Sequence, residues 1–596
     1  MFELDCTILT DKKVLDASGH TAKFCDKMMT SKDGLDFVRA DHILEDWIEH
    51  RLEAPGVNAA LAQELNDVLA RIDDMSLPEL DAALRKYFVP KPAAAAAAAA
   101  APGAKKDKKA DAAAAAAAAA APAKVPVYDD EWQPAKDFNL MFGTGIGPSG
   151  NSPGFLRPET AQGMFVNFKR LLDYAGGKLP FGAAQIGKAF RNEINPQQGL
   201  LRVREFWLAE VEFFVHPNRS EHDRFDRIAD VEVRLFGRER QLGDRKYDVV
   251  TIREAVARGI IRSQTLAYFM ARTWLFLASV GASKQYMRFR QHLPNEMAHY
   301  ARDCWDAELL TSYGWIEVVG HADRAAYDLN AHQDASGHKL DVYESWQQAD
   351  WKPYDAVAAK LNKGAIGKAF KQQAQELISA LEKLGKDDAV ALEAKLAADG
   401  KAPFGGVELT RDMASFAIEK AFHKGETVQP AVIEPAFGIG RIMYCVFEHS
   451  FRQRAVEKET EKRNYLSLPV SVAPVKFSVL PLKPSQASHR DVAERVENLL
   501  VANGISCKVD GVNETIGRRY ARTDEIGIPF GITIDDDTVD KAHADFDSVT
   551  LRDRDSMQQV RVKLAELEKV VDSIIKQRMA WSDVVNTLKL PIWEAK

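Results

Sequence analysis

The sequence predicts an α+β protein in which an antiparallel β-sheet domain, flanked by helices, is followed by a smaller C-terminal α/β domain. Strand-like segments on both sides of the turn-forming run Asn195–Gly199 indicate a β-hairpin. Strand-like and helix-like segments are mixed over residues 137–345, as expected for a sheet with helices packed on it. From residue 473 the two patterns alternate, which is typical of a compact α/β module.

Composition indicates a multidomain globular protein. The 596 residues are 46% hydrophobic and 28% charged, enough for roughly two to four domains. No apolar run reaches membrane-spanning length and the first residues do not resemble a signal peptide, so a cytoplasmic location is expected. The formal net charge of −7 does not exclude a nucleic-acid partner, because phosphate binding depends on local basic patches.

Cysteine usage argues against a disulfide framework or a Cys-x-x-Cys zinc site. The five cysteines are widely separated in the sequence, which favours reduced, structural side chains. They are Cys6, Cys25, Cys304, Cys445 and Cys507.

The chain divides into six predicted segments. Residues 1–89 begin the main domain and include a helical insert over 58–88. Residues 90–126 are an Ala/Lys-rich low-complexity insert, for which a solvated, mobile linker is favoured over RNA contact. Residues 127–345 form the core, 346–427 a Lys/Ala-rich helical insertion, 428–472 the rest of the core and 473–596 the C-terminal domain.

The C-terminal segment shows the clearest secondary-structure pattern. We expect strands over 476–482, 506–510 and 530–534 and helices over 487–503 and 515–526, around a largely parallel sheet.

The predicted hairpin carries the most informative side chains. Strand alternation places them on two surfaces, Gln185, Arg191 and Glu193 on one and Arg202, Arg204, Phe206 and Glu210 on the other. Arginines suit phosphate groups, an aromatic ring suits a purine, and carboxylates accept from amino groups. Taken alone, the hairpin fits an exposed ribbon with ordinary salt bridges equally well.

Two glycines and an arginine follow a second informative strand. The segment 432–447 reads as a buried strand that ends at Pro435 and turns through Gly438 and Gly440 into a helix. Glu434 and Arg441 could then face one cavity, although a structural turn with a surface arginine explains the pattern as well.

Two further acidic residues need a cationic partner or a structural role. Glu159 lies at a predicted helix entrance, where it could complement the helix dipole or bind an ammonium group. Glu317 lies in a strand among apolar neighbours, so its carboxylate needs a basic side chain or Mg²⁺.

The motifs together resemble those of a known enzyme family. Phe-Arg-Asn-Glu at 190–193, Arg-x-x-x-Phe-x-x-x-Glu at 202–210 and Gly-x-Gly-Arg at 438–441 resemble motifs 2 and 3 of class II aminoacyl-tRNA synthetases. The strings at 156–163, 320–329, 433–441 and 517–527 are similar to glycyl-tRNA synthetases of the dimeric type found in eukaryotes, archaea and some bacteria. The resemblance runs from Glu3 to about Leu590.

The resemblance implies a class II antiparallel catalytic domain, a C-terminal anticodon-binding domain and a two-step reaction. Glycine and ATP would form glycyl-adenylate, with Mg²⁺ as cofactor, and the glycyl group would pass to tRNA(Gly). The substrates react directly with one another, so positioning and electrostatics would supply catalysis.

The resemblance also assigns residue roles. The catalytic set is Arg191, Glu193, Glu317 and Arg441, with Glu317 as the metal ligand. ATP would contact these residues together with Asn192, Leu201, Arg202, Val203, Phe206, Val318, Gly438 and Gly440. Glycine would contact Arg39, Glu159, Phe206, Glu210, Glu434, Pro435 and Ala436. Alanine would be rejected sterically, because a methyl group normally adds binding.

A basic cluster in the C-terminal domain is expected to bind tRNA. Its members are Lys508, Arg518, Arg519 and Arg522. A charge-paired surface helix that includes Asp524 and Glu525 is the alternative.

Two departures from the family pattern keep other functions open. Ala436 stands where the family usually has serine, which removes a hydroxyl near the expected glycine. Met1 corresponds to a point after the family's early glycine-rich strand and most of its motif 1 helix, so we expect a chain truncated at its start, and a homodimer where that segment is present. The alternatives are a catalytically impaired tRNA-binding or regulatory paralogue and a class II synthetase for another amino acid. A mitochondrial pool also stays open.

Overall fold

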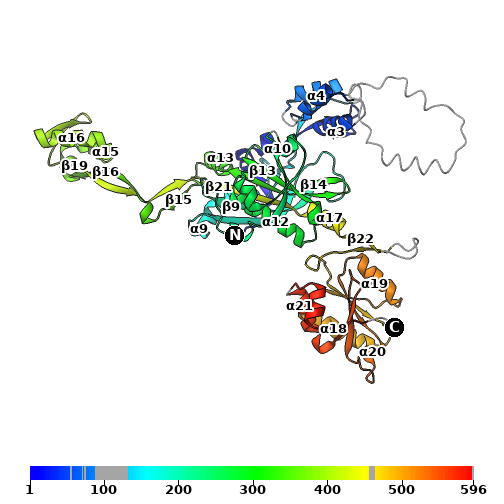
Figure 1. Ribbon diagram of the computed structural model, residues 1–596. Coiled ribbons are helices and arrows are strands. Elements are labelled where there is room, and N and C mark those ends of the chain that lie inside the picture. The colour runs from blue at the N-terminus through cyan, green and yellow to red at the C-terminus, as the bar shows by residue number, and fades with distance from the viewer. Residues whose placement is uncertain are drawn as a thin grey trace. The chain divides into compact units, whose positions relative to one another are not determined.

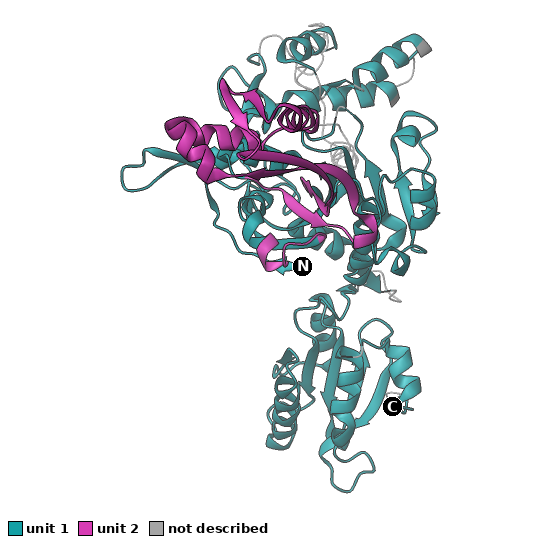
Figure 2. Ribbon diagram, turned by 90° about the vertical axis from the view of Figure 1, so that its left-hand side faces the viewer, with its two compact units in different colours: residues 1–171, 181–338, 431–596 teal, residues 172–180, 339–430 magenta. Residues whose placement is uncertain are grey.

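The computed structural model describes residues 1–53, 57–69, 71–72, 75–87, 132–294, 296–454, 463–576 and 578–593. The predicted low-complexity insert at 90–126 lies outside these residues. The chain forms two compact units (Figure 2). Unit 1 contains residues 1–171, 181–338 and 431–596, and unit 2 contains residues 172–180 and 339–430.

A nine-stranded sheet forms the centre of unit 1 (Figure 1). Only the β1–β8 and β10–β12 pairs are parallel, so the predicted antiparallel platform is confirmed. In sheet order the strands are β1 (Phe2–Glu3), β8 (Phe181–Phe190), β9 (Glu205–Val215), β21 (Ala431–Gly438), β14 (Gly314–Ala325), β13 (Asp303–Thr311), β12 (Met287–Gln291), β10 (Glu232–Phe236) and β11 (Asp248–Thr251).

Helix α12 (Gln264–Ser279) covers one face of this sheet and leaves the other for the site. Its Phe269 and Phe276 rings contact Phe213 of β9 and Phe437 of β21, at centroid distances of 5.2 and 5.7 Å. Side chains alternate along a strand, so Glu210 of β9 points to the opposite face. The helix itself is fixed by Ser263, whose hydroxyl accepts from the backbone N–H of Leu266.

The hairpin forms as predicted, but its arginines lie in the loop rather than in strands. β8 ends at Phe190 and β9 begins at Glu205, while Gln198 and Gly199 adopt positive φ angles of 61° and 62°. The prediction that Gln185 and Glu210 occupy different faces is wrong. The two are directly opposite in the ladder, and such cross-strand pairs share a face.

Strand β21 continues through Pro435 to Gly438, so the prediction that it ends at Pro435 is wrong. Ile433 and Ala436 pair with β9, but Glu434 and Pro435 between them do not. This is consistent with the missing N–H of proline. The same register places Glu434 opposite Glu212 of β9. Helix α17 (Ile439–Ser450) follows, and Arg441 lies in its first turn as predicted.

The amino-terminal part of the chain adds the short helices α1 (Lys12–Ala17) and α2 (His20–Lys23), a small three-stranded sheet and three longer helices. The sheet order is β4–β3–β5, formed by Phe37–Arg39, Cys25–Thr30 and Lys136–Asn139. Helices α3 (Ala40–Glu53), α4 (Ala59–Leu69) and α5 (Leu77–Tyr87) share an apolar core. The helical insert predicted over 58–88 corresponds to α4 and α5.

Unit 2 is less helical than expected. Helices α14 (Lys363–Phe370), α15 (Ala374–Glu382) and α16 (Lys386–Asp399) are accompanied by a ten-residue ladder between β16 (Lys352–Leu361) and β19 (Ala414–His423). Short pairs β15–β20 (Val342–Ser345, Gly425–Val428) and β17–β18 (Lys401–Phe404, Val407–Thr410) complete it. The sequence analysis predicted only helices here, because lysine and alanine favour helix, and so it did not predict these strands.

The C-terminal module matches the predicted elements to within two residues. They are β24 (Phe477–Pro481), α18 (Ala487–Ala502), β25 (Cys507–Val509), α19 (Ile516–Glu525) and β26 (Phe530–Ile534). Two further strands, β27 (Ser548–Asp553) and β28 (Gln559–Lys563), pair antiparallel. The sheet, in order β25–β24–β26–β27–β28, is therefore mixed rather than largely parallel.

Candidate active site

A cavity of about 530 Å³ lies over the face of the central sheet that carries Glu210. Residues far apart in the sequence line it, including the predicted phosphate-side residues Arg191, Arg202, Glu317 and Arg441. The predicted ammonium ligands Glu159, Glu210 and Glu434 line the same cavity. So do Glu193, Leu201, Val203, Phe206, Val318, Ala436, Gly438 and Gly440. Among the residues that the structure describes, Asn192 and Pro435 are not part of this lining.

Arg191 is held between two aromatic rings. Its guanidinium carbon lies 5.3 Å from the Phe24 centroid and 5.4 Å from the Phe206 centroid, and its Nε donates to the carbonyl of Pro158 at 3.3 Å. A planar cation fixed in this way keeps other N–H groups for an anionic ligand. Phe206, predicted to stack on adenine, contacts this guanidinium.

Arg441 joins three segments of the phosphate side. Its Nε donates to the carbonyl of Leu201 at 3.1 Å, and its Nη1 donates to the Glu317 carbonyl at 3.1 Å and carboxylate at 3.2 Å. Glu317 is half exposed. Desolvation opposes its charged form, but Arg441, His292 and Arg191 together lower the pKa of Glu317, which keeps the carboxylate ionised.

Arg324 holds the acidic pocket together. It is fully buried on β14 and pairs with Asp328 through two bonds of 2.6 and 2.8 Å. Its Nη1 donates to Glu434 at 2.5 Å, and Glu159 lies 3.8 Å away. The ring of Tyr300 covers the guanidinium at 3.6 Å.

Local backbone geometry positions two carboxylates of this pocket. Glu210 Oε2 accepts from the Thr160 backbone N–H at 2.6 Å and hydroxyl at 2.5 Å, at the start of α8 (Ala161–Val166). Glu159 lies one residue earlier, at the helix entrance as predicted, and contacts His20 Nε2 at 3.3 Å. Both carboxyl groups therefore lie near the start of α8, close enough for Glu159 to raise the pKa of Glu210.

The pocket contains more carboxylates than cationic side chains. Burial raises the pKa of Glu434 to about 8, and Glu210 and Glu159 add to this rise against the opposing effect of Arg324. Burial and Glu159 also raise the pKa of Glu210. For Glu159, His20 and Arg324 overcome the desolvation effect and lower the pKa. The carboxyl groups with raised pKa values therefore hold protons that an ammonium group could replace.

Glu212 adds a further carboxyl that the sequence analysis missed. It is fully buried opposite Glu434, and neither of its oxygens has a hydrogen-bond partner among the described residues. Burial and the charge of Glu434 raise its pKa well above the ordinary value. An unpaired buried carboxylate is costly, so this side chain is a neutral carboxylic acid.

The sequence analysis also did not identify Arg324, Asp328 and His20 as residues of the acidic pocket. Arg324 and Asp328 lie four residues apart within the quoted motif at 320–329, and that i, i+4 spacing of opposite charges was the available signal. His20 offers no sequence signal, because only tertiary packing brings it to Glu159.

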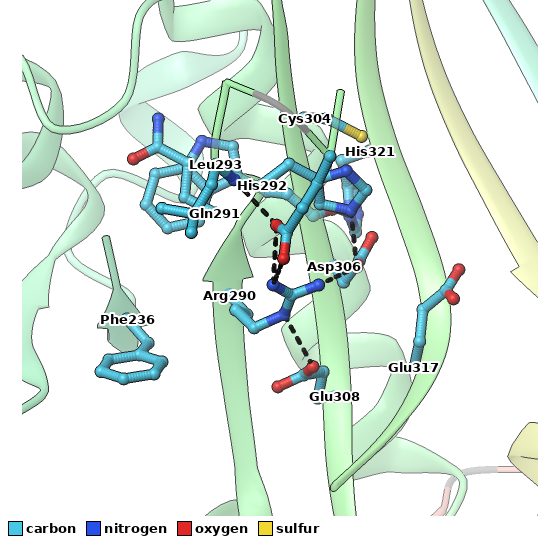
Figure 3. A network of polar contacts seen from close by, with 12 residues as sticks. Phe236, Arg290, Gln291, His292, Leu293, Cys304, Asp306, Glu308, Glu317 and His321 are labelled. Atoms are coloured by element: carbon cyan, nitrogen blue, oxygen red, sulfur yellow. Dashed lines mark hydrogen bonds and ion pairs between the residues drawn. The ribbon is translucent and has the colours of Figure 1, made fainter. Parts of the chain in front are cut away.

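A polar network forms the wall beside Glu317 (Figure 3). Asp306 of β13 accepts from His292 Nε2 at 2.7 Å, and Arg290 of β12 pairs with Glu296 and Glu308 at 2.9 and 3.2 Å. Desolvation disfavours the imidazolium, but the hydrogen bond to Asp306 and the neighbouring Cys304 side chain raise the pKa of His292 to about 11. Burial and Glu317 raise the pKa of Asp306 to about 6.

Arg39 does not join the acidic pocket. It ends β4, where its guanidinium pairs with Asp41 at 2.5 Å and with Asp26 at 3.3 Å. It is not among the residues that line the cavity. The prediction that it contacts glycine is withdrawn, because two carboxylates fix it within the small sheet.

Arg519 is the second correction. Its side chain is fully buried in the C-terminal module, where Nη1 donates to the carbonyl of Pro481 at 2.7 Å and Nη2 to that of Asp510. Lys508 and Arg518 are exposed, and Arg522 pairs with Asp510 and Glu514 while staying 40% exposed. Arg519 therefore serves the core of the module and cannot reach a nucleic acid.

Two family models match segments of this chain. Residues 151–450 match the tRNA synthetase class II core domain (G, H, P, S and T), and residues 476–574 match an anticodon binding domain. The prolyl-tRNA synthetase of Cryptosporidium parvum, solved with L-proline and AMP, aligns with a TM-score of 0.39 at 13% identity over 76% of this chain and 68% of its own. The core-domain match makes the chain a class II aminoacyl-tRNA synthetase.

Curated relatives narrow the class further. The glycine–tRNA ligase of Drosophila melanogaster is 42% identical over 100% of this chain and 72% of its own length. The glycine–tRNA ligase of Methanocaldococcus jannaschii is 39% identical over 97% of this chain and 90% of its own. The chain belongs to the glycine–tRNA ligase family.

Proposed function

We propose that this protein activates glycine with ATP to form glycyl-adenylate and pyrophosphate, and then transfers the glycyl group to the 3′ end of tRNA(Gly). The observation that carries the proposal is one cavity with two chemically opposite ends. Arg191, Arg202 and Arg441 line the phosphate side, while Glu159, Glu210 and Glu434 surround a buried pocket suited to an ammonium group.

The reaction needs charge stabilisation at the α-phosphate, where the glycine carboxylate attacks. We assign that role to Arg191, which the rings of Phe24 and Phe206 hold in place. Arg441 would bind the terminal phosphate from the first turn of α17, while Arg202 and Glu193 would hold the rest of ATP. Binding both substrates in fixed positions brings the reacting atoms together.

Mg²⁺ suits the residues on the phosphate side. The Glu317 carboxylate is ionised and half exposed, and the Asp306 carboxyl lies beside it. Oxygen ligands of this kind are those that Mg²⁺ prefers, so Glu317 would hold the ion. The ion would neutralise charge on the phosphates of ATP.

Glycine selection requires steric rejection of alanine. The substrate site lies among Glu159, Glu210, Glu434 and Ala436, in a wall that Arg324 and Tyr300 make rigid. We propose that this closed pocket leaves no space for a methyl group. Ala436 supplies no hydroxyl, so the ammonium group depends on the carboxylates alone.

Glycine-dependent exchange of pyrophosphate into ATP tests this function. The protein should exchange with glycine and not with threonine, proline or histidine. Exchange with one of the other amino acids would favour a different class II synthetase. No exchange from a folded protein that binds tRNA would favour the regulatory paralogue, for which Ala436 is the specific observation.

tRNA recognition is assigned to the exposed part of the basic cluster. We propose that Lys508, Arg518 and Arg522 contact the phosphate backbone of tRNA(Gly). Reversing the charges of Lys508 and Arg518 should raise the KM for tRNA by roughly tenfold without changing pyrophosphate exchange. Equal losses in both assays would contradict a separate tRNA-binding role.

The assembly and location of the enzyme are also proposals. We propose a homodimer, as the family resemblance implies, which sedimentation of the purified protein would test. No helix in the described part of the chain is long and apolar enough to cross a membrane. We propose a cytoplasmic enzyme with an additional mitochondrial pool, because one Saccharomyces cerevisiae relative is named glycine–tRNA ligase 1, mitochondrial. Fractionation of cells would test both locations.

A further inference from the structure

Three side chains with metal-binding chemistry meet in the cavity wall beside Glu317. His292 follows β12, and Cys304 and Asp306 are alternate residues of β13, so the last two share a face. One ligand atom from each of the three lies within 4.8 Å of the others. All three residues line the cavity.

We propose that His292, Cys304 and Asp306 bind a thiophilic divalent cation of the Zn²⁺ type, and that this ion inhibits the proposed adenylate-forming reaction. Imidazole, thiolate and carboxylate are the ligands that Zn²⁺ takes in proteins. Three protein ligands with a fourth position open to a cavity are typical of accessible zinc sites. The Cys304 sulfur favours Zn²⁺ over Mg²⁺ at this site, because Mg²⁺ prefers oxygen ligands.

The backbone already brings the ligands close. The backbone N–H of His292 donates to the carbonyl of Cys304 at 3.0 Å, and the β12–β13 ladder fixes both segments. Bond lengths of about 2.0 to 2.3 Å place the ligands of a tetrahedral ion about 3.3 to 3.7 Å apart. Ligand atoms within 4.8 Å of one another therefore need to approach by up to about 1.5 Å.

A second layer of contacts orients the ligands (Figure 3). Asp306 lies 3.6 Å from Arg290, which Glu296 and Glu308 hold in turn. Outer contacts of this kind fix the orientation of metal ligands. The Nδ1 of His292 is buried and has no hydrogen-bond partner among the described residues. The ring therefore keeps one nitrogen without a competing contact.

Metal binding requires deprotonated ligands. A dication bound by a neutral imidazole, a carboxylate and a thiolate carries no net charge, and any proton on these side chains leaves to solvent. The occupied site therefore places no net charge in a largely buried wall.

Inhibition follows from the position of the site and rests on the proposed function. Asp306 lies close enough to Glu317 for the Glu317 carboxylate to raise the pKa of Asp306. An ion held by Asp306 would place its open position toward the side lined by Glu317 and Arg441. It would then bind a phosphate oxygen in an unproductive position and draw Glu317 away from Mg²⁺.

Cobalt provides a spectroscopic probe of the site in the full-length protein. After treatment with a chelator and its removal, Co²⁺ should bind with a sulfur-to-cobalt charge-transfer band that Zn²⁺ abolishes by displacement. Cys304→Ser should remove the band. Cys507→Ser, in the C-terminal module, and His543→Ala, in the sulfur-free cluster with Asp537 and Asp545, should leave it unchanged.

The absence of this band in the unmodified protein, or its persistence in Cys304→Ser, would overturn the proposal. Circular dichroism checks that each variant folds. If Cys304→Ser does not fold, His292→Gln and Asp306→Asn take its place, with an expected loss of at least about tenfold in Co²⁺ affinity.

Activity measurements distinguish a failure of the proposed metal site from a failure of the proposed glycine activation. Protein kept in chelator should exchange pyrophosphate with glycine, and added Zn²⁺ should suppress that exchange in the unmodified protein but not in Cys304→Ser. No exchange in chelator would count against the proposed function, whatever the cobalt spectrum shows. Exchange that Zn²⁺ suppresses equally in both proteins would count against the metal site alone.

Discussion

The two ends of the cavity stabilise charge in opposite ways. On the phosphate side, Arg191 is half-buried and Arg441 is 36% exposed, and rings and backbone carbonyls hold the two arginines. In the acidic pocket, Arg324 is fully buried among carboxyl groups that outnumber it. Arginine keeps its charge in both places, whereas carboxyl groups gain protons when buried. One sheet face thus offers a permanent anion site beside a cation site whose charge depends on pH.

The largest expected effect lies on the phosphate side. Arg191→Ala should reduce glycine-dependent exchange by about 100- to 1,000-fold or more, because it removes the charge opposite the reacting phosphate. Arg204→Ala is the matched control, since Arg204 belongs to the same loop and donates to the carbonyl of Glu193 from an exposed position. Near-normal exchange by a folded Arg191→Ala protein would remove that residue from the centre of the mechanism.

The second-largest effect is expected in the acidic pocket, on the free energy of unfolding. Arg324→Leu should lower the free energy of unfolding by about 3 to 5 kcal/mol, because it leaves Asp328 and Glu434 without their buried partner. Urea denaturation followed by circular dichroism measures the loss. A change below about 1 kcal/mol would mean that the neighbouring carboxyl groups adjust without this guanidinium.

The two ends should also differ in pH dependence. Glu434 has a pKa raised to about 8 in the ligand-free protein, so below that pH an ammonium group must displace a proton. The KM for glycine should fall about tenfold per pH unit from about pH 6 toward pH 8 and then level off. The KM for ATP should change little over this range, because arginines stay protonated.

Initial exchange rates at each pH, with either substrate varied, give both constants. Glu434→Gln should flatten the glycine profile, since its amide does not titrate. An equally steep profile for ATP would show that the protonation change is not confined to the acidic pocket.

The smallest effect is expected at Glu212. Because this side chain is buried without a hydrogen-bond partner in the described part of the chain and carries a raised pKa, Glu212→Gln replaces one neutral group by another of similar shape. We expect less than about 1 kcal/mol change in unfolding free energy and a KM for glycine within about twofold. Glu159→Gln, which removes a carboxylate bound to His20, should raise that KM by at least about tenfold. Similar effects of the two changes would mean that Glu212 is ionised.

The sequence predicted the convergence of Arg191, Glu317 and Arg441 because long motifs carry those residues. It predicted the C-terminal elements because strand and helix periods alternate there without interruption. It could not place Arg519, because an arginine on an amphipathic helix is normally exposed. The carbonyls of Pro481 and Asp510 and the carboxylate of Asp510 compensate for its burial. The sequence also could not show that Arg39 forms ion pairs with Asp26 and Asp41 within the small sheet.

The acidic pocket shows where prediction from the sequence ends. Glu159, Glu210 and Glu434 lie in recognisable motifs, whereas the contact of His20 with Glu159 exists only after the chain folds. The position of Glu212 opposite Glu434 depends on a ladder register that passes through Pro435. Side chains placed by register and tertiary packing leave no local pattern in the sequence.

The central claim is that one cavity binds an amino acid ammonium at its buried end and ATP phosphates at its arginine end. Pyrophosphate exchange by the purified, chelator-treated protein, measured with each of the twenty amino acids in turn, tests it most directly. Exchange with glycine, little or none with alanine, loss of exchange in Arg191→Ala and a raised KM for glycine in Glu434→Gln would agree with the account. A folded protein that exchanges with no amino acid, or that prefers a larger one to glycine, would contradict it.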